Sequence, residues 1–411
     1  MTPPPRTPQE IATADARDPL AFARARFSLP QGMIYLDGNS LGALPAKTPA
    51  ALERVSRGEW GGSLISGWNA HDWIGAPQRV GGLIAPLIGA EADEVIACDS
   101  TSVNIYKAAA AALAMRPGRA VILADADEFP TDLYMLQGLA EQTGASFRAA
   151  PESGWERALG EHAALFCLSA VHYRTGRLRD MAAWTARAHA AGALMLWDLS
   201  HAAGAIRVDL NGCDADFAVG CGYKYLNGGP GAPAYLYVAR RHQAAAQTPL
   251  PGWMGHAAPF AFEGEHRPAP GMARWLAGTP PILGLAALEE GVRTFDGVDM
   301  AQVREKSLAL GELFLDLVTT GAPGVFEVAS APAVDRGSQV SLRHPDGYAL
   351  VQALIAAGVV GDFRAPDLMR FGFTPLYLSF TEVAEAARRL VGLIESGAWR
   401  EPRFAQRLAV T

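Results

Sequence analysis

Short apolar runs alternate with helical segments through the middle of the chain. Each run has the length of a buried strand, about four to eight residues. The segments between them, near residues 131–143 and at residues 181–191, show the apolar spacing of helices. Such runs between helices indicate a mainly parallel sheet that is buried on both faces. The expected strands are residues 120–125, 164–171, 193–199, 216–222 and 234–239.

This alternation starts upstream and stops near Gly291. Residues 94–115 form a short strand, a turn rich in serine and threonine, and an alanine-rich helix. Beyond Gly291 come a long amphipathic helix at residues 299–321, two short strands, a helix at residues 347–358, a strand-like stretch at residues 369–380 and a final helix. The second pattern predicts a smaller α+β domain.

Before the sheet, the chain is polar and rich in proline, then forms a short strand, a turn and a helix from about Thr48 to Trp60. With 411 residues, it exceeds what one hydrophobic core usually serves. We therefore expect an α/β fold in three parts. They are an N-terminal arm (1–60) that packs with the small domain, a large domain (61–290) that contains the sheet, and a small α+β domain (291–411). Its ligand should bind at the carboxyl ends of the parallel strands.

Composition and charge narrow the class of function. Half of the residues are apolar and 19% are charged, as in compact folded chains. The net charge is −7 and no basic run exceeds a pair, so we expect no nucleic acid partner. The four cysteines lack metal-ligand spacing and fit reduced core thiols, so we expect no metal. No signal peptide and no apolar run of roughly 18 residues is present, so we expect a cytoplasmic protein without membrane contact.

Two ionisable residues follow buried strands. Asp198 ends one strand and Lys224 comes just after another, so both side chains can project into one crevice. A lysine of this kind is the usual nucleophile for a Schiff base with an aldehyde cofactor. A carboxylate that faces a pyridine nitrogen keeps that ring protonated as an electron sink. The pair indicates pyridoxal 5′-phosphate. The alternatives are that Asp198 caps a helix and that Lys224 is an ordinary surface lysine.

Two further segments carry groups that such a cofactor needs. Ser100, Thr101 and Ser102 stand where a helix begins, and backbone N–H groups and hydroxyls there can bind a phosphate. A plain N-cap is the alternative. Phe129 and Asp132 come after a strand. An aromatic side chain there is usually core, but the proline and charges beside Phe129 predict a loop and make the first of these residues a candidate to stack on the pyridine ring. The second is placed to support the partner of the ring nitrogen.

Several motifs stand in a fixed order along the chain: "YLDGNSLG", "STSVN", "EFPTD", "DLSHAAG", "GYKYLNGGPGAPAYLYV" and "PGWMGH". Together they resemble kynureninase, a fold-type-I pyridoxal-phosphate family of the aminotransferase class V group. The lysine motif and "DLSHAAG" alone indicate only the wider group, whereas the combination is much more specific. The resemblance covers most of the chain, from about Ile34 to the final domain.

The resemblance implies a role for individual residues. The expected catalytic residues are Lys224, which forms the Schiff base, Tyr223, which touches the phosphate and donates a proton, and Asp198, on the pyridine side. The other expected cofactor-binding residues are Thr101, Ser102, Phe129, Asp132, Ser169, His201, Trp253 and Thr279. The family often has threonine at the position of Ser169. Trp253 and Thr279 are expected to reach the cofactor of the other subunit in a homodimer. The expected substrate-binding residues are Arg370, which clamps the α-carboxylate, Asn39, Ser40, Trp68 and His71.

The resemblance also implies a reaction. It is the hydrolytic cleavage of the Cβ–Cγ bond of L-kynurenine to anthranilate and L-alanine, a step of tryptophan catabolism in the kynurenine pathway. Thr279 stands where eukaryotic members tend to carry asparagine, so we expect a preference for kynurenine without a 3-hydroxyl group. Without the family, Arg370 is a salt-bridged or surface arginine and His71 a structural loop histidine.

Two other functions remain open at this point. A class V cysteine desulfurase or selenocysteine lyase shares the lysine and the aspartate, but it needs a reactive cysteine late in the chain. The last cysteine here, Cys221, precedes Lys224. A catalytically idle pyridoxal-phosphate-binding protein would keep the fold, but the retention of Lys224, Asp198, Tyr223 and Arg370 together argues against it.

Overall fold

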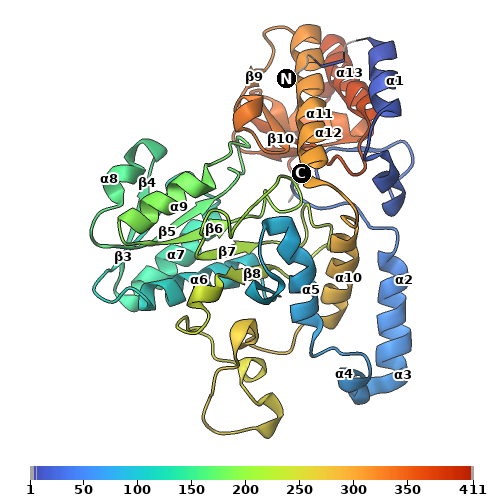
Figure 1. The fold of residues 1–411 in the computed structure, drawn as a ribbon. Coiled ribbons are helices and arrows are strands. Elements are labelled where there is room, and N and C mark those ends of the chain that lie inside the picture. Colours follow the sequence, from blue (N-terminus) through green and yellow to red (C-terminus); the bar gives the residue numbers. More distant parts are fainter. Residues whose placement is uncertain (1–3, 6, 409–411) are drawn as a thin grey trace.

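A seven-stranded sheet forms the centre of the protein (Figure 1). The computed structural model describes residues 4–5 and 7–408, so part of the polar N-terminal stretch lies outside the described residues. The strands are β2 (Val95–Ala97), β3 (Val121–Asp125), β4 (Ser146–Ala150), β5 (Ala163–Ser169), β6 (Leu194–Asp198), β7 (Phe217–Gly220) and β8 (Tyr235–Val238). Their order is β2-β8-β7-β6-β5-β3-β4. β8 pairs antiparallel with β7 and β2, and the other pairs are parallel. The expected α/β fold is confirmed.

Both faces of this sheet are packed. On β6, Met195 and Trp197 belong to one apolar cluster, whereas Leu194 and Leu196 belong to another, as alternation along a strand requires. All four side chains are buried. This explains why the strands appear in the sequence as continuous apolar runs. The helices around the sheet are α5 (Ala76–Ile84), α6 (Thr101–Ala114), α7 (Pro130–Thr143), α8 (Trp155–Ala158), α9 (Met181–Ala190) and α10 (Ile282–Arg293).

The C-terminal part is a smaller α+β unit. Its elements are α11 (Met300–Gly321), β9 (Glu327–Val328), β10 (Gln339–Arg343), α12 (Gly347–Ala356), β11 (Val359–Val360), β12 (Asp362–Arg364), β13 (Leu368–Gly372), α13 (Phe380–Ser396) and α14 (Pro402–Ala405). Four strands form an antiparallel sheet in the order β12-β13-β10-β9, and Figure 1 shows it beside α11 and α12 and apart from the large sheet. On β13, Arg370 lies opposite Asp362 of β12.

The N-terminal segment joins the two units. It contains α1 (Pro8–Ala16), β1 (Ile34–Tyr35), α2 (Thr48–Glu53), α3 (Gly61–Ser63) and α4 (Gly67–Ala70). Asp15 accepts hydrogen bonds from the first turn of α13, and Asp18 forms an ion pair of 2.6 Å with Lys306 of α11. β1 pairs with β11 in parallel. Further along, α2 packs against α10 of the large unit. The exact domain limits at residues 60 and 290 stay a proposal.

Three segments differ from the sequence-based expectation for physical reasons. β4 was not expected because it is an edge strand whose Ser146, Arg148 and Ala149 are exposed, so no apolar run marks it. The strand expected at residues 369–380 ends at Gly372, and Ser379 instead caps α13. The helix expected to reach Trp60 does so, but its last seven residues are π-helical.

No helix in the described part of the chain is long and apolar enough to cross a membrane. The four cysteines, all within the described residues, are free thiols, and Cys98, Cys167 and Cys221 are buried.

Candidate active site

A pocket opens at the carboxyl edge of the large sheet. Its volume is about 600 Å³ with the open mouth included, which is within the usual range of ligand pockets. β5 and β6 end in its wall, and α6 begins there. Nine of the residues expected from the sequence line it together: Thr101, Ser102, Phe129, Asp132, Ser169, Asp198, His201, Tyr223 and Lys224.

Lys224 lies in the loop that follows β7. Its Nζ is 2.9 Å from Nε2 of His201 and 5.8 Å from the ring centre of Phe129. Burial, and then the charge of Lys224, lower the pKa of His201 well below its ordinary value. The imidazole is therefore neutral near pH 7, and its Nε2 can accept a hydrogen from the lysine amine. The contact orients Lys224 within the pocket.

Two buried carboxyl groups line the same pocket as this lysine. Asp198 Oδ1 accepts hydrogen bonds from the N–H and the hydroxyl of Ser200, at 2.8 Å and 2.6 Å. Burial raises the pKa of Asp198. Burial and the charge of Asp198 together raise the pKa of Asp132 well above its ordinary value. Asp132 Oδ2 is buried and has no hydrogen-bond partner among the described residues. The pair is suited to a cationic ring nitrogen.

The start of α6 forms another part of the pocket lining. Ser100 is the N-cap, and its Oγ accepts a hydrogen bond of 3.3 Å from the N–H of Val103. Thr101 and Ser102 follow and line the pocket with their side chains. The free N–H groups and positive end of a 14-residue helix favour an anion here. The capping role thus belongs to Ser100, whereas Thr101 and Ser102 remain in the pocket lining.

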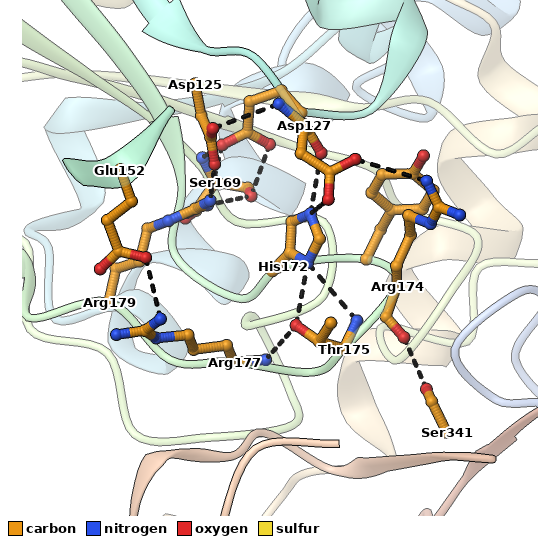
Figure 2. A network of polar contacts seen from close by, with 12 residues as sticks. Asp125, Asp127, Glu152, Ser169, His172, Arg174, Thr175, Arg177, Arg179 and Ser341 are labelled. Carbon is orange, nitrogen blue, oxygen red and sulfur yellow. Dashed lines mark hydrogen bonds and ion pairs between the residues drawn. The ribbon is translucent and has the colours of Figure 1, made fainter. Parts of the chain in front are cut away.

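Next to Ser169 lies a buried ion network that sequence reasoning missed (Figure 2). Arg179 donates to Ser169 Oγ and to Glu128 Oε1, both at 2.8 Å, and pairs with Asp125. The hydroxyl of Ser169 in turn donates to Glu128 Oε2 at 2.7 Å. Glu128 lines the pocket and is buried. In the sequence it precedes Phe129 in a charged loop, so it resembles a solvated acid, and only the tertiary structure shows its burial.

Arg370, Asn39 and Ser40 lie next to the pocket but not in its lining. Arg370 Nη1 donates to the carbonyl oxygen of Tyr173 at 2.6 Å, and Tyr173 lines the pocket. Arg370 Nη2 lies 3.3 Å from Ser40 Oγ. Asn39 is fully buried, and neither polar atom of its side chain has a hydrogen-bond partner among the described residues. Arg370, on β13, and Ser40 thus form a polar wall where the small sheet meets the pocket.

The other four expected residues lie elsewhere. His71 Nε2 is 2.9 Å from Ser63 Oγ, and Trp68 packs edge-on against Trp73. Trp253 is 40% exposed, and Thr279 is exposed. None of Trp68, His71, Trp253 and Thr279 lines the pocket of its own chain.

The family follows from comparison with known proteins. A family model described as the kynureninase C-terminal domain matches residues 303–390. A kynureninase of Deinococcus radiodurans is 51% identical over 394 residues, which covers 94% of this chain and 96% of the relative. The chain belongs to the kynureninase family. Another kynureninase, from Burkholderia mallei, is 47% identical and covers 99% of this chain and 100% of its own.

Solved structures with lower identity share the fold of this kynureninase family member. A cysteine desulfurase from Thermococcus onnurineus NA1 has a TM-score of 0.78 at 18% identity, covering 92% of this chain and 99% of its own. The cysteine desulfurase CsdA from Escherichia coli has a TM-score of 0.77 at 18% identity, covering 92% of this chain and 98% of its own. At this identity the similarity extends to the fold alone.

Proposed function

We propose that the pocket binds pyridoxal 5′-phosphate and that the protein hydrolyses the Cβ–Cγ bond of L-kynurenine to anthranilate and L-alanine. One observation carries the proposal: Lys224, a pair of buried carboxyl groups and the start of α6 meet in one pocket of a kynureninase family member. The protein is then a hydrolase that acts on a carbon–carbon bond of a ketone, in tryptophan catabolism.

The residues present fit the cofactor. Asp132 Oδ2 and His201 Nδ1 are buried without a hydrogen-bond partner among the described residues, which suits a site completed by a polar ligand. Lys224 would hold the aldehyde carbon covalently and Asp198 the ring nitrogen, with Asp132 behind it. Thr101, Ser102 and Tyr223 would hold the phosphate, with Phe129 against the ring and Ser169 and His201 beside it. When bound, the cofactor supplies an electron sink for the carbanion next to the substrate's amino group.

The chain's own groups would move the protons. The amine of Lys224 would take the α-proton once the substrate's amino group has replaced it. Burial raises the pKa of Tyr223, so its phenol keeps its proton near pH 7 and can donate it. Water provides the hydroxyl of the new anthranilate carboxyl group, and a proton ends on the β-carbon that becomes the methyl group of alanine.

Arg370, Ser40 and Asn39 would receive the α-carboxylate from the polar wall beside Tyr173. This role is supported by the hydrogen bond from Arg370 to the carbonyl oxygen of the pocket residue Tyr173. Trp68 and His71 would contact the aryl ring. Thr279 in place of asparagine supports a preference for kynurenine over 3-hydroxykynurenine.

A homodimer would complete the site. Trp253 and Thr279 are exposed and lie outside the pocket of their own chain, so they can reach the cofactor of a second copy. Large apolar side chains are also exposed on the segments that carry Trp253 and Thr279 and on the N-terminal segment. Two of them are Phe262 (78% exposed) and Ile65 (81% exposed). A second copy would bury them. We further propose a cytoplasmic location, consistent with four free thiols.

The cysteine desulfurase alternative fails on chemistry. It needs an accessible thiolate, but Cys221, the last cysteine, is buried, and this burial raises its pKa. A cofactor-binding protein without catalytic activity would not need Tyr223 in the pocket or Arg370 beside it.

A substrate panel tests the proposal. The purified protein loaded with pyridoxal 5′-phosphate is mixed separately with L-kynurenine, 3-hydroxykynurenine and L-cysteine, and anthranilate fluorescence, its hydroxylated analogue and sulfide are measured. We expect rapid release of anthranilate, slower turnover of the hydroxylated substrate and no sulfide. Release of sulfide, or no product from kynurenine, would reject the assigned reaction.

A further inference from the structure

Arg370 has little capacity left for a ligand. Its Nε and Nη2 pair with the carboxylate of Asp362, Nη2 also contacts Ser40 Oγ, and Nη1 donates to the Tyr173 carbonyl. A guanidinium has about five N–H groups, so a single one remains, and the side chain is only 2% exposed. A bidentate grip on a carboxylate uses two parallel N–H groups. As it stands, Arg370 can supply half of such a grip.

A second guanidinium lies beside the same aspartate. Arg364 Nη2 is 2.9 Å from Asp362 Oδ2, and Arg364 Nη1 donates to the Phe363 carbonyl at 3.1 Å. Within residues 7–408 it has no other hydrogen-bond or ion-pair partner. The Arg364 side chain is 37% exposed, whereas those of Asp362 and Arg370 are 2% exposed. Arg364 is therefore the accessible member of an Arg364–Asp362–Arg370 triad.

The triad is close enough to the pocket to act on its wall. Burial lowers the pKa of His201, and the charge of Arg364 contributes to this decrease. Burial raises the pKa of Tyr223, and the charge of Arg364 opposes this increase. Both residues line the pocket, and the triad also meets the pocket wall directly, because Arg370 donates to the carbonyl oxygen of the pocket residue Tyr173 at 2.6 Å.

The charges around the triad favour an anion. Two guanidinium groups share the carboxylate of Asp362, whose pKa is lowered by its hydrogen bond to Arg370 and the charges of both arginines against the opposing effect of burial. The second carboxyl group is Asp37, and its burial, with the charge of Asp362, raises its pKa to about 7. Near neutral pH, Asp37 is thus partly protonated and the group keeps a net positive charge. A bound carboxylate would neutralise it.

We propose that Arg364 binds the α-carboxylate of the amino-acid substrate jointly with Arg370 and so makes that carboxylate a requirement for tight binding. The proposal rests on the proposed function for the identity of the substrate. Arg364 supplies the exposed N–H groups that Arg370 lacks, while Asp362 holds the two guanidinium groups at a fixed separation.

Steady-state kinetics of Arg364→Gln and Arg364→Lys test this. A hydrogen bond between charged groups corresponds to about a 10- to 100-fold change in affinity. We expect the KM for L-kynurenine to rise by that factor in Arg364→Gln, with kcat within about threefold of wild type. Arg364→Lys should recover part of the loss. The inhibition constant of the decarboxylated amine of kynurenine should not change, because it has no carboxylate to lose.

Arg343→Gln is the matched control. Arg343 lies on β10 of the same small sheet, is 34% exposed and pairs with Asp367 at 2.7 Å, but among the described residues it has no hydrogen bond or ion pair with Asp362. Its KM should equal that of wild type. An unchanged KM in Arg364→Gln would overturn the proposal, as would an equal loss of affinity for the decarboxylated amine, which would indicate a general structural effect.

A second readout separates this proposal from the proposed function. Binding of L-alanine, followed by the absorption of the bound cofactor, needs no turnover. If wild type fails to cleave kynurenine, the assigned reaction is wrong, but weaker alanine binding in Arg364→Gln would still support the carboxylate site. Equal alanine binding in wild type and Arg364→Gln would reject it.

Discussion

Gly42 is where the N-terminal arm touches the loop that carries Lys224. Its N–H donates to the Tyr223 carbonyl at 2.7 Å, and the residue is buried. A Cβ added here would lie 2.4 Å from the carbonyl oxygen of Lys224 and 2.6 Å from Cα of Asn227. Both are backbone atoms, so no side-chain rotation can remove the overlap. Since relaxed contacts need about 3.5 Å, the loop or the arm must move by roughly 1 Å.

We predict that Gly42→Ala impairs both stability and catalysis. Overpacking of this kind lowers the free energy of unfolding by about 1–3 kcal/mol. A displacement of about 1 Å at a reacting group costs up to about 100-fold in rate, so kcat/KM for kynurenine should fall by about that factor. Urea unfolding of the cofactor-free protein measures the first effect, and anthranilate release measures the second.

Gly138→Ala is the control for this prediction. Gly138 lies within α7, and a Cβ there would have no heavy atom within 4 Å. Alanine in an open helical position should raise the free energy of unfolding by up to about 1 kcal/mol and leave kinetics unchanged. Wild-type stability and kcat/KM in Gly42→Ala would refute the reasoning, because the arm could then move without disturbing Lys224.

Three other substitutions test other parts of the account. The polar and charged groups near Asp37 are Tyr35, Ser40, Asp362, Arg364 and Arg370. Burial raises the pKa of Asp37 from 3.8 to about 7. The stability that Asp37 contributes is therefore full below pH 3.8 and is lost as the pH rises through about 7. The stability advantage of Asp37→Asn over wild type should therefore grow from about pH 4 to pH 7, to at most about 4 kcal/mol, and a pH-independent difference in unfolding free energy would contradict this. Burial and Asp198 also raise the pKa of Asp132, so Asp132→Asn should raise the melting temperature of the cofactor-free protein at neutral pH and lower kcat; a lower melting temperature would contradict the first part. Thr279→Asn should shift the ratio of kcat/KM values toward 3-hydroxykynurenine, and an unaltered ratio would reject that role.

The local sequence was enough to predict the pocket residues that lie at the ends of strands. Asp198 and Lys224 each follow an apolar run, and parallel strands bring such positions to one edge. The direction of β8 was not predictable from apolar spacing, because a buried antiparallel strand has the same pattern as a parallel one. The buried strands of the sheet could thus be expected, but the exposed edge strand β4 and the reversed direction of β8 could not.

Contacts between distant segments could not be predicted. The pairing of Arg370 with Asp362 depends on the register of β12 and β13, and its contact with Tyr173 depends on how the small sheet meets the large one. Glu128 gave no sequence signal, because its partner Arg179 lies 51 positions later in the chain. Thr279 lies outside its own chain's pocket. The role proposed for it needs a second chain, to which a single sequence gives no coordinates.

The most direct test of the central claim compares wild type with Lys224→Ala, with the exposed Lys47→Ala as control. Each protein is loaded with pyridoxal 5′-phosphate, and two quantities are measured: the absorption band of the lysine-bound cofactor, and the amounts of anthranilate and alanine formed from L-kynurenine. We predict that wild type and Lys47→Ala show the band and form the two products in equal amounts, and that Lys224→Ala shows neither. Turnover by Lys224→Ala, or a wild type that binds the cofactor without this band, would contradict the account.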